Sequence, residues 1–190
     1  MVDLELEIRN CAHVLLEGGV ILYPTDTVWG LGCDATNAAA VQKIFEIKRR
    51  PGTKSMIVLL AEEKDILHYV AAPPPDIIAM LEEFTSPTTV IYDGALGLAD
   101  GVTAEDGSVA IRICHDPFCK ALIKRIKKPL ISTSANISGE PAPSVYSEIS
   151  PDVLSGADYT VKYRQDDDIP KKPSRIIKMN DDGSYTIIRP

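Results

Sequence analysis

The chain has 190 residues, of which 45% are hydrophobic and 25% charged, and its formal net charge is −7. These proportions are typical of a globular protein and exclude disorder as the main state, and no apolar run approaches the roughly 18 residues of a membrane span. The acidic excess argues against nucleic-acid binding over the whole surface, although it is compatible with a local basic patch.

We expect one domain that spans residues 1–190, since domains usually hold about 100–200 residues. The N-terminus, Met1–Glu7, is acidic and amphipathic, which is typical of neither a signal peptide nor an Arg-rich transit peptide. Four cysteines without a secretion signal indicate a reducing compartment. We therefore expect the protein in the cytoplasm, with no membrane among its partners.

Apolar spacing and turn residues predict helices that interleave with strands. The first half is predicted to form a helix at 4–15, a strand at 20–23, a loop at 24–33, a helix at 41–48 and a strand at 56–60. The second half is predicted to form short helices at 62–69 and 76–84, strands at 88–92 and 108–113, a helix at 118–126, a strand at 130–132, a short helix around 145–149 and a hairpin of 175–179 with 185–189. Because the hairpin breaks strict alternation, we expect an α/β (α+β) fold with a mixed sheet and helices packed on it.

Hydroxyls, a carboxylate and glycines follow the first predicted strand, in Pro24–Gly32. Ligands of open α/β sheets tend to lie at such strand ends. A P-loop is excluded, because the spacing Gly-x-x-x-x-Gly-Lys-Ser/Thr is absent. The alternative interpretation is a plain turn, in which the carboxylate of Asp26 is satisfied and the glycines serve packing.

Four cations lie within seven residues around the end of the second predicted helix, at Lys48, Arg49, Arg50 and Lys54. Cations near a helix C-terminus interact favourably with the helix dipole, which is one interpretation of the cluster. The dipole needs one or two of them, so a cluster this dense on an acidic protein also indicates a site for an anion such as a polyphosphate.

Short hydrogen-bonding side chains occupy five of the eight residues of Ser132–Gly139, directly after a predicted buried strand. No bulky side chain fills the space, so backbone and hydroxyl groups can approach a ligand closely. The alternative is a solvated loop.

Single cations near strand ends are further candidates. Arg112 follows Val109-Ala110-Ile111 in an otherwise apolar strand, where a guanidinium requires an anionic partner. Arg175 and Arg189, taken alone, are more typical of surface charges. We predict no metal site in the protein: Cys114-His115-x-x-x-Cys119 matches no common zinc pattern, and Cys119 is interpreted as a small core residue.

Six segments in order carry a resemblance to a known family. They are Pro24–Gly32, Lys48–Pro51, Ser108–Arg112, Ser132–Gly139, Pro173–Ile177 and Ile187–Pro190. Together they resemble the threonylcarbamoyl-AMP synthase family, also called YrdC-like, over nearly the whole chain. The resemblance implies a three-layer YrdC-like fold in which a twisted mixed sheet and its helices surround a basic cleft. The chain departs from the family pattern at Lys54-Ser55-Met56 and Thr85-Ser86-Pro87.

The resemblance also implies site residues, position by position. For ATP they are Lys48, Arg50, Lys54, Ser108, Asn136, Ser144 and Arg189. For L-threonine they are Thr27, Arg112, Ser134 and Ser174. No catalytic dyad is evident, so the sequence leaves the catalytic residue unknown.

Members of the family condense L-threonine, bicarbonate (or CO2) and ATP to threonylcarbamoyl-adenylate and pyrophosphate, and other enzymes pass the group to tRNA. The resemblance thus implies a nucleotidyltransferase that takes Mg²⁺ with its ATP and has the tRNA threonylcarbamoyl transferase machinery downstream. One alternative is an RNA-binding module without turnover, specific for double-stranded RNA or the ribosome, whose cations lie in 48–54 and 120–128. The other is a related enzyme that forms a carbamoyl-adenylate from another amine or carbamoyl donor.

Overall fold

A computed structural model describes residues 2–50, 56–180 and 183–190 of the chain. Its helices are α1 (Leu4–Leu16), α2 (Ala38–Ile47), α3 (Ile77–Glu82), α4 (Pro117–Ile126) and α5 (Pro151–Gly156), with 3₁₀ helices η1 (Glu63–His68) and η2 (Tyr146–Glu148). Its strands are β1 (Ile21–Tyr23), β2 (Gly30–Gly32), β3 (Ile57–Leu60), β4 (Thr88–Tyr92), β5 (Val109–Ile113), β6 (Leu130–Ser134), β7 (Tyr159–Thr160), β8 (Arg175–Met179) and β9 (Tyr185–Arg189).

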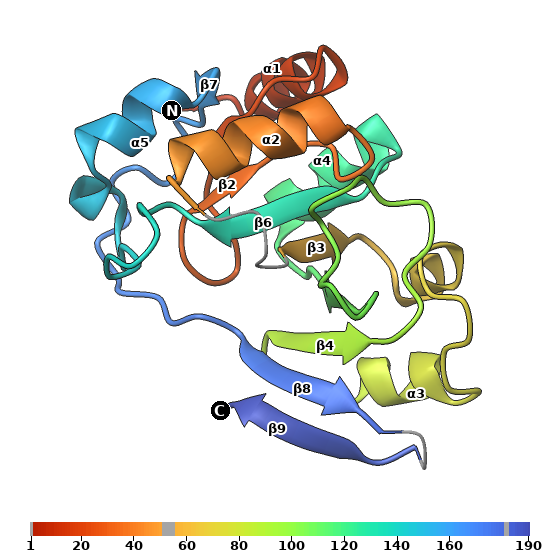
Figure 1. Cartoon of the computed structure of the whole chain (residues 1–190). Coiled ribbons are helices and arrows are strands. Elements are labelled where there is room, and N and C mark those ends of the chain that lie inside the picture. The colour runs from red at the N-terminus through yellow and green to blue at the C-terminus, as the bar shows by residue number, and fades with distance from the viewer. Residues whose placement is uncertain (1, 51–55, 181–182) are drawn as a thin grey trace.

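The described strands form one sheet in the order β7-β1-β2-β6-β3-β5-β4-β8-β9. Strand β1 runs parallel to β7, β3 to β5, and β4 to β8, whereas the other neighbours are antiparallel. The hairpin of β8 and β9 forms one edge of the sheet (Figure 1). The predicted mixed sheet with a closing hairpin is confirmed.

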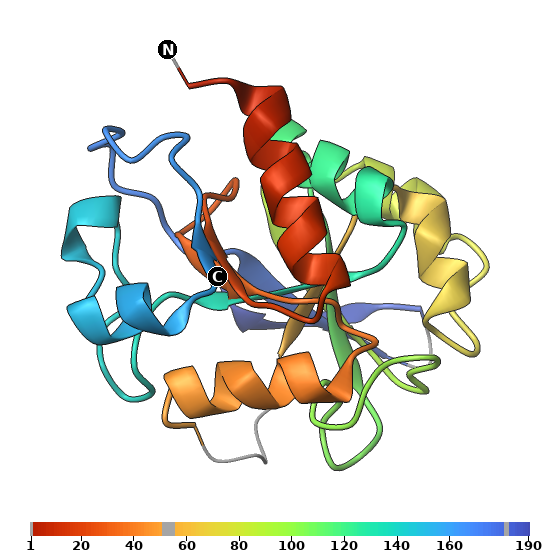
Figure 2. The same ribbon diagram turned by 90° about the horizontal axis from the view of Figure 1, so that it is seen from above.

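Helices cover both faces of the sheet and make a three-layer structure (Figure 2). Helices α1 and α4 pack together on one face, and α2 lies on the other, against α5. The alternation of β1 supplies both cores, because Ile21 and Tyr23 belong to the cluster under α1 and α4, and Leu22 to the cluster under α2. The predicted mixed α/β fold is therefore confirmed.

Local capping explains where the helices begin and end. Helix α1 begins after Asp3, whose carboxylate accepts hydrogen bonds from the backbone N–H groups of Glu5 and Leu6, and it ends before Gly18, which adopts a φ of 75°. Helix α4 begins in the same way, with Asp116 as N-cap and Pro117 in the first turn. Among the described residues, no helix combines the length and the apolar character that crossing a bilayer requires.

Two predicted boundaries shift around the segments that later form the site. The predicted loop 24–33 contains β2, which pairs with β1 and β6; three residues are too few to give a periodic signal. The predicted strand at 130–132 extends to Ser134, because its last residues pair with Gly30 and Leu31.

Other differences between the predicted and the observed elements concern helices and a strand at the edge of the sheet. The helix predicted at 41–48 spans Ala38–Ile47 and ends before Pro51 and Gly52, which lie outside the described residues. The segment predicted as a helix at 62–69 is the 3₁₀ helix η1. Helix α5 and strand β7 were not predicted, because each is too short for a clear pattern.

Candidate active site

The loop between β1 and β2 is fixed by hydrogen bonds among its own threonines. The Thr25 hydroxyl donates to the carbonyl oxygen of Val28 at 2.8 Å and accepts from the backbone N–H of Thr27 at 2.9 Å. The hydroxyl oxygens of Thr25 and Thr27 lie 3.0 Å apart. Trp29 then packs against Tyr146, with ring centroids 4.9 Å apart. The loop therefore holds Thr27 in one position without any ligand.

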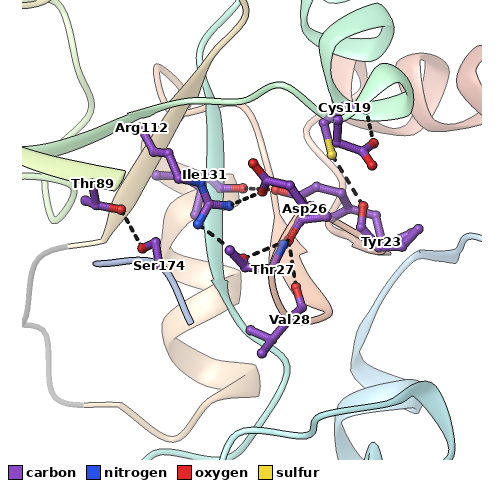
Figure 3. Close-up of polar contacts among 12 residues, drawn as sticks. Tyr23, Asp26, Thr27, Val28, Thr89, Arg112, Cys119, Ile131 and Ser174 are labelled. Atoms are coloured by element: carbon purple, nitrogen blue, oxygen red, sulfur yellow. Dashed lines mark hydrogen bonds and ion pairs between the residues drawn. The ribbon is translucent and has the colours of Figure 1, made fainter. Parts of the chain in front are cut away.

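Arg112 lies in the middle of the sheet, on β5, with 3% of its side chain exposed. Its Nη2 atom contacts Asp26 Oδ1 at 3.1 Å, and its Nη1 donates to the Thr27 hydroxyl at 3.2 Å (Figure 3). The prediction that this guanidinium has an anionic partner is confirmed. Asp26 has Arg112 as its ion-pair partner, and a Cβ on Gly32 would lie 2.6 Å from the Ile131 carbonyl oxygen, so the satisfied carboxylate and the packing glycines of the alternative interpretation are also present in this loop.

Lys48 follows α2 as its C-cap, but its side chain turns to another part of the chain. The ammonium donates to the carbonyl oxygens of Ser134 and Asn136, at 2.5 and 2.8 Å. Burial, and then the charge of Arg50, lower the pKa of Lys48 to about 8. Lys48 thus joins α2 to the end of β6, rather than capping the carbonyls of its own helix.

The polar segment after β6 is not a solvated loop. Ser132 and Thr133 are buried within β6. The Ser134 hydroxyl donates to Asn136 Oδ1 at 2.5 Å, and the Asn136 amide donates to the carbonyl oxygens of Ile137 and Glu140. The side chain of Asn136 therefore shapes the turn that follows the strand.

The C-terminal strands bring two further side chains to the same place. The Ser174 hydroxyl is buried 2.7 Å from that of Thr89 (Figure 3). Arg189 donates from Nε and Nη2 to the Ser174 carbonyl oxygen, at 3.0 and 2.7 Å. Burial, and then the charge of Arg112, lower the pKa of Arg189. Arg189 is therefore held by the Ser174 backbone, with the charge of Arg112 in its surroundings.

These segments enclose a cavity of about 340 Å³. Six predicted site residues line it, and they are Thr27, Arg50, Arg112, Ser134, Ser174 and Arg189. Arg50 reaches the Thr133 hydroxyl at 3.5 Å from Nη1, and its pKa is lowered by burial. A larger cavity of about 550 Å³, beside Pro73–Pro75, contains none of the predicted site residues.

The remaining predicted site residues lie outside this cavity lining. Lys48 and Asn136 lie behind it and hold Ser134. Ser108 is buried just before β5, and Ser144 lines a small adjoining hollow with Thr27. Lys54 lies outside the described residues.

Two side chains of the site, Thr89 and Thr133, have no role in the sequence prediction. Thr89 is the register partner of Arg112 across β4 and β5, which only strand pairing reveals. Thr133 lies within a predicted motif and contacts Arg50. The run of polar residues along β6 was the sequence signal that could have identified Thr133 as a site residue.

The donors around the cavity do not suit a metal held by the protein itself. The lining carries three arginines and several hydroxyls, and no carboxylate belongs to it within the described chain. Nor do three His, Cys, Asp or Glu residues gather as a metal cluster anywhere in the described ranges. Hard cations such as Mg²⁺ prefer carboxylate and carbonyl oxygens. Cys114 and Cys119 are buried in the core under α4, where burial raises the pKa of the Cys119 thiol.

Comparison with known proteins gives the same family from sequence and from structure. The Sua5/YciO/YrdC family model, described as "Telomere recombination", matches residues 13–190. A threonylcarbamoyl-AMP synthase of Xanthomonas oryzae pv. oryzae (strain PXO99A) is 37% identical over 159 residues, which are 82% of this chain and 85% of the relative. The synthase of Stenotrophomonas maltophilia (strain K279a) is 36% identical over 153 residues, 79% of this chain and 82% of the relative.

Two solved structures share the fold. P. abyssi Sua5 complexed with L-threonine matches with a TM-score of 0.86 and 25% identity, over 100% of this chain and 55% of the solved one. The chain thus spans about half the length of that Sua5. E. coli YciO matches with a TM-score of 0.83 and 21% identity, over 100% of this chain and 90% of the other.

Proposed function

Because this chain belongs to the Sua5/YciO/YrdC family, we propose that it is an L-threonylcarbamoyladenylate synthase. The observation that carries the proposal is the cavity of about 340 Å³, to which segments far apart in the sequence bring arginines and small hydroxyls. The relatives named threonylcarbamoyl-AMP synthase support the same reaction. The substrates are then L-threonine, ATP, and bicarbonate or CO2.

The cavity suits two reactants that bind side by side. Arg50 and Arg189 are proposed to bind the phosphates of ATP, since guanidinium groups match phosphate oxygens in charge and geometry. Arg112, Thr27 and Ser174 are proposed to bind L-threonine, with its carboxylate at Arg112. The Sua5 structure that contains L-threonine supports an amino-acid site in this fold.

The proposed reaction forms two bonds in succession. The neutral amine of threonine adds to CO2 and loses a proton, which gives a carbamate. A carbamate oxygen then attacks the α-phosphorus of ATP, and pyrophosphate leaves. This second step depends on alignment and charge neutralisation more than on a strong base, in agreement with a cavity of arginines and hydroxyls.

Ser134 is proposed to lie where the two reactants meet, with Lys48 and Asn136 holding it from behind the cavity. Lys48 holds the backbone of the turn, and Asn136 accepts the Ser134 hydroxyl hydrogen bond. Mg²⁺ is proposed to enter as part of the nucleotide substrate, since the donors of the cavity do not suit a resident metal.

We further propose that the product passes to an enzyme that modifies tRNA, and that the protein acts in the cytoplasm, which the four free thiols support. The RNA-binding alternative has weaker support, because two cations of the 120–128 surface are paired. Lys124 contacts Glu62 and Arg125 contacts Glu5.

The decisive experiment measures pyrophosphate release with ATP, Mg²⁺ and bicarbonate, with and without L-threonine. The proposal predicts release that depends on L-threonine and on bicarbonate. Release that needs another amine, or a carbamoyl donor in place of both, would favour the related carbamoyl-adenylate enzyme. Salt-dependent RNA binding without any release would favour the RNA-binding module.

A further inference from the structure

The buried hydroxyl of Thr89 lies beside the half of the site that is proposed to bind L-threonine. Its oxygen is 2.7 Å from Ser174 Oγ (Figure 3), and both residues are buried. Among the described residues, Ser174 is the one hydrogen-bond partner of the Thr89 hydroxyl. Because Ser174 lines the cavity and Thr89 does not, this contact links the interior of the sheet to the cavity.

Strand pairing explains why the two hydroxyls meet. Thr89 on β4 is the register partner of Arg112 on β5 and of Ile176 on β8, and register partners point to the same face of a sheet. Ser174 precedes Ile176 by two residues, so its side chain points to this face as well. Arg112, Ile176 and Ser174 all line the cavity. Thr89 therefore belongs to the cavity side of the sheet, beneath the lining.

Both the backbone and the side chain of Ser174 are held in place. Arg189 donates from Nε and Nη2 to the Ser174 carbonyl oxygen, and the backbone N–H of the next residue, Arg175, donates to the Pro87 carbonyl oxygen at 3.0 Å. The Ser174 hydroxyl lies against that of Thr89. The position of the Ser174 hydroxyl oxygen is thus fixed, and only the direction of its proton is left open.

Either hydroxyl can donate in this pair, and burial favours one of the two directions. If Ser174 donated to Thr89, the Thr89 proton would have no acceptor among the described residues, and a buried donor without an acceptor is costly. If Thr89 donates to Ser174, the Ser174 proton is free to point into the cavity, where a bound group can accept it. A hydroxyl that accepts one hydrogen bond also becomes a stronger donor in the next.

The charges around Ser174 favour an anionic group as the acceptor of this proton. Arg112 and Arg189 line the same cavity and bring positive charge to the space in front of Ser174. A hydroxyl that donates to a carboxylate there makes a charge-assisted hydrogen bond, which is stronger than one between neutral groups. A donor that is oriented in advance also loses less entropy on binding.

We propose that Thr89 is a positioning residue for L-threonine: its hydroxyl donates to Ser174 and so directs the Ser174 proton at the carboxylate that Arg112 binds. This inference rests on the proposed function and adds to it a residue that acts through Ser174 without touching the substrate. The carboxylate then accepts from a guanidinium and from a hydroxyl that is fixed by the sheet.

The test compares Thr89→Val, Thr89→Ser, Ser174→Ala and the double variant of Thr89→Val with Ser174→Ala. Valine keeps the branched shape of threonine and suits a strand, so Thr89→Val removes the hydroxyl with little other change. Thr88→Val is the matched control, because Thr88 is buried on the same strand but donates to the Ser86 carbonyl oxygen at 3.0 Å. Steady-state pyrophosphate release is measured while L-threonine and ATP are each varied, and thermal unfolding by circular dichroism establishes that each variant is folded.

For Thr89→Val we expect the KM for L-threonine to rise by roughly three- to tenfold, the scale of one neutral hydrogen bond, while the KM for ATP stays within about twofold of the wild-type value. Thr89→Ser keeps the hydroxyl and the wild-type KM, and Thr88→Val resembles wild type. Ser174→Ala raises the KM for L-threonine by roughly tenfold or more. Adding Thr89→Val to Ser174→Ala causes no further rise, because the hydroxyl that Thr89 directs is already missing.

A substrate analogue tests which group of L-threonine accepts the proton. L-2-Aminobutyrate keeps the carboxylate and lacks the hydroxyl, so Thr89→Val should weaken its inhibition by the same factor as it raises the KM for L-threonine. An inhibition constant that Thr89→Val leaves unchanged would overturn the assignment to the carboxylate. The inference is also overturned if Thr89→Val keeps the wild-type KM for L-threonine, if it raises both KM values together, or if its effect multiplies with that of Ser174→Ala.

If Thr89→Val fails to fold, Thr89→Cys takes its place in the same assay. A thiol fits the space of the hydroxyl but is a weak donor, so the KM for L-threonine should again rise at a constant KM for ATP, and an unchanged KM for L-threonine would refute the inference. Wild-type protein that releases no threonine-dependent pyrophosphate would instead refute the proposed function itself.

Discussion

Lys48 offers a quantitative test of how the site is built. Only 2% of its surface is exposed, and its ammonium donates to the carbonyl oxygens of Ser134 and Asn136. Replacing it with methionine keeps the length and the apolar stem but removes the charge and the hydrogen bonds. The difference in the free energy of unfolding between Lys48→Met and wild type therefore shows how far the buried cation destabilises the folded protein.

The magnitude follows from the pKa. Burial, and then the charge of Arg50, lower the pKa of Lys48 from 10.5 to about 8. Each unit of difference between the folded and unfolded states is worth about 1.4 kcal/mol, so protonated Lys48 lowers the free energy of unfolding by about 3 kcal/mol. Below pH 8 both states hold the proton and the cost is fully present; between pH 8 and 10.5 the unfolded state binds more protons, so the free energy of unfolding rises with pH.

The assay is urea unfolding of wild type and Lys48→Met at intervals from about pH 7 to about pH 10. We expect the difference in unfolding free energy to move in favour of wild type by up to about 1.4 kcal/mol per pH unit above pH 8. The unfolding free energies of the two proteins must be compared with each other, because buried thiols change the pH dependence in the opposite direction. Burial raises the pKa of Cys11 from 9.0 to about 12, so the unfolded state loses this proton first and the free energy of unfolding falls as the pH rises. That contribution is the same in both proteins and cancels.

Lys43→Met serves as the matched control, since Lys43 lies on the same helix with an exposed side chain. The Lys43 ammonium donates to the Gly18 carbonyl oxygen at the surface, so this variant removes a lysine of the same helix without removing a buried charge. A flat difference for Lys48→Met above pH 8, or a slope of equal size in Lys43→Met, would refute the reasoning.

Three further predictions concern the cavity and its frame. Arg50→Ala is expected to lower ATP-dependent turnover by at least roughly tenfold. The control Arg49→Ala removes an exposed ion pair and should leave turnover nearly unchanged. Equal turnover of the two folded variants would show that Arg50 does not belong to the site. Ser134→Ala and Asn136→Ala are expected to lower activity per folded molecule at nearly unchanged Tm, and a large fall in Tm with retained activity would make the turn purely structural. Gly32→Ala would place a Cβ 2.6 Å from a backbone carbonyl of β6, so thermal unfolding should show a stability loss of about 1–3 kcal/mol, and an unchanged Tm would contradict the close approach.

A helix or strand could be predicted from the sequence where a few neighbouring residues mark where it begins or ends. The pair Asp116-Pro117 marks the start of α4, and the segment Thr88–Tyr92, rich in β-forming residues, is β4 as predicted. Each of these features is decided within a few residues. Strand β2 could not be found in this way, because its pairing with β1 and β6 defines it. Helix α5 has a start signal, with Ser150 as N-cap and Pro151 in the first turn, but its six residues are too few for a periodic pattern.

The sequence could predict which residues belong to the candidate site, but it could not predict how they are arranged. The motifs placed Thr27, Arg112 and Ser134 among the candidates, and the order of strands then brings them to one cavity. No spacing along the chain gives that order, since β6 lies between β2 and β3. For the same reason the sequence could require an anionic partner for Arg112 but could not choose Asp26 for it.

The cations that line the cavity or lie just behind it share a physical property that bears on the proposed function. Burial lowers the pKa of Lys48, Arg50 and Arg189, and neighbouring positive charge adds to the effect at Lys48 and Arg189. The folded protein therefore spends stability to hold positive groups close together, away from water. Folding alone gives no reason for that arrangement, since apolar residues of similar size would serve the core better. An anion bound among these groups would relieve both their desolvation and their mutual repulsion, which is the preorganisation that the proposed binding of ATP phosphates requires.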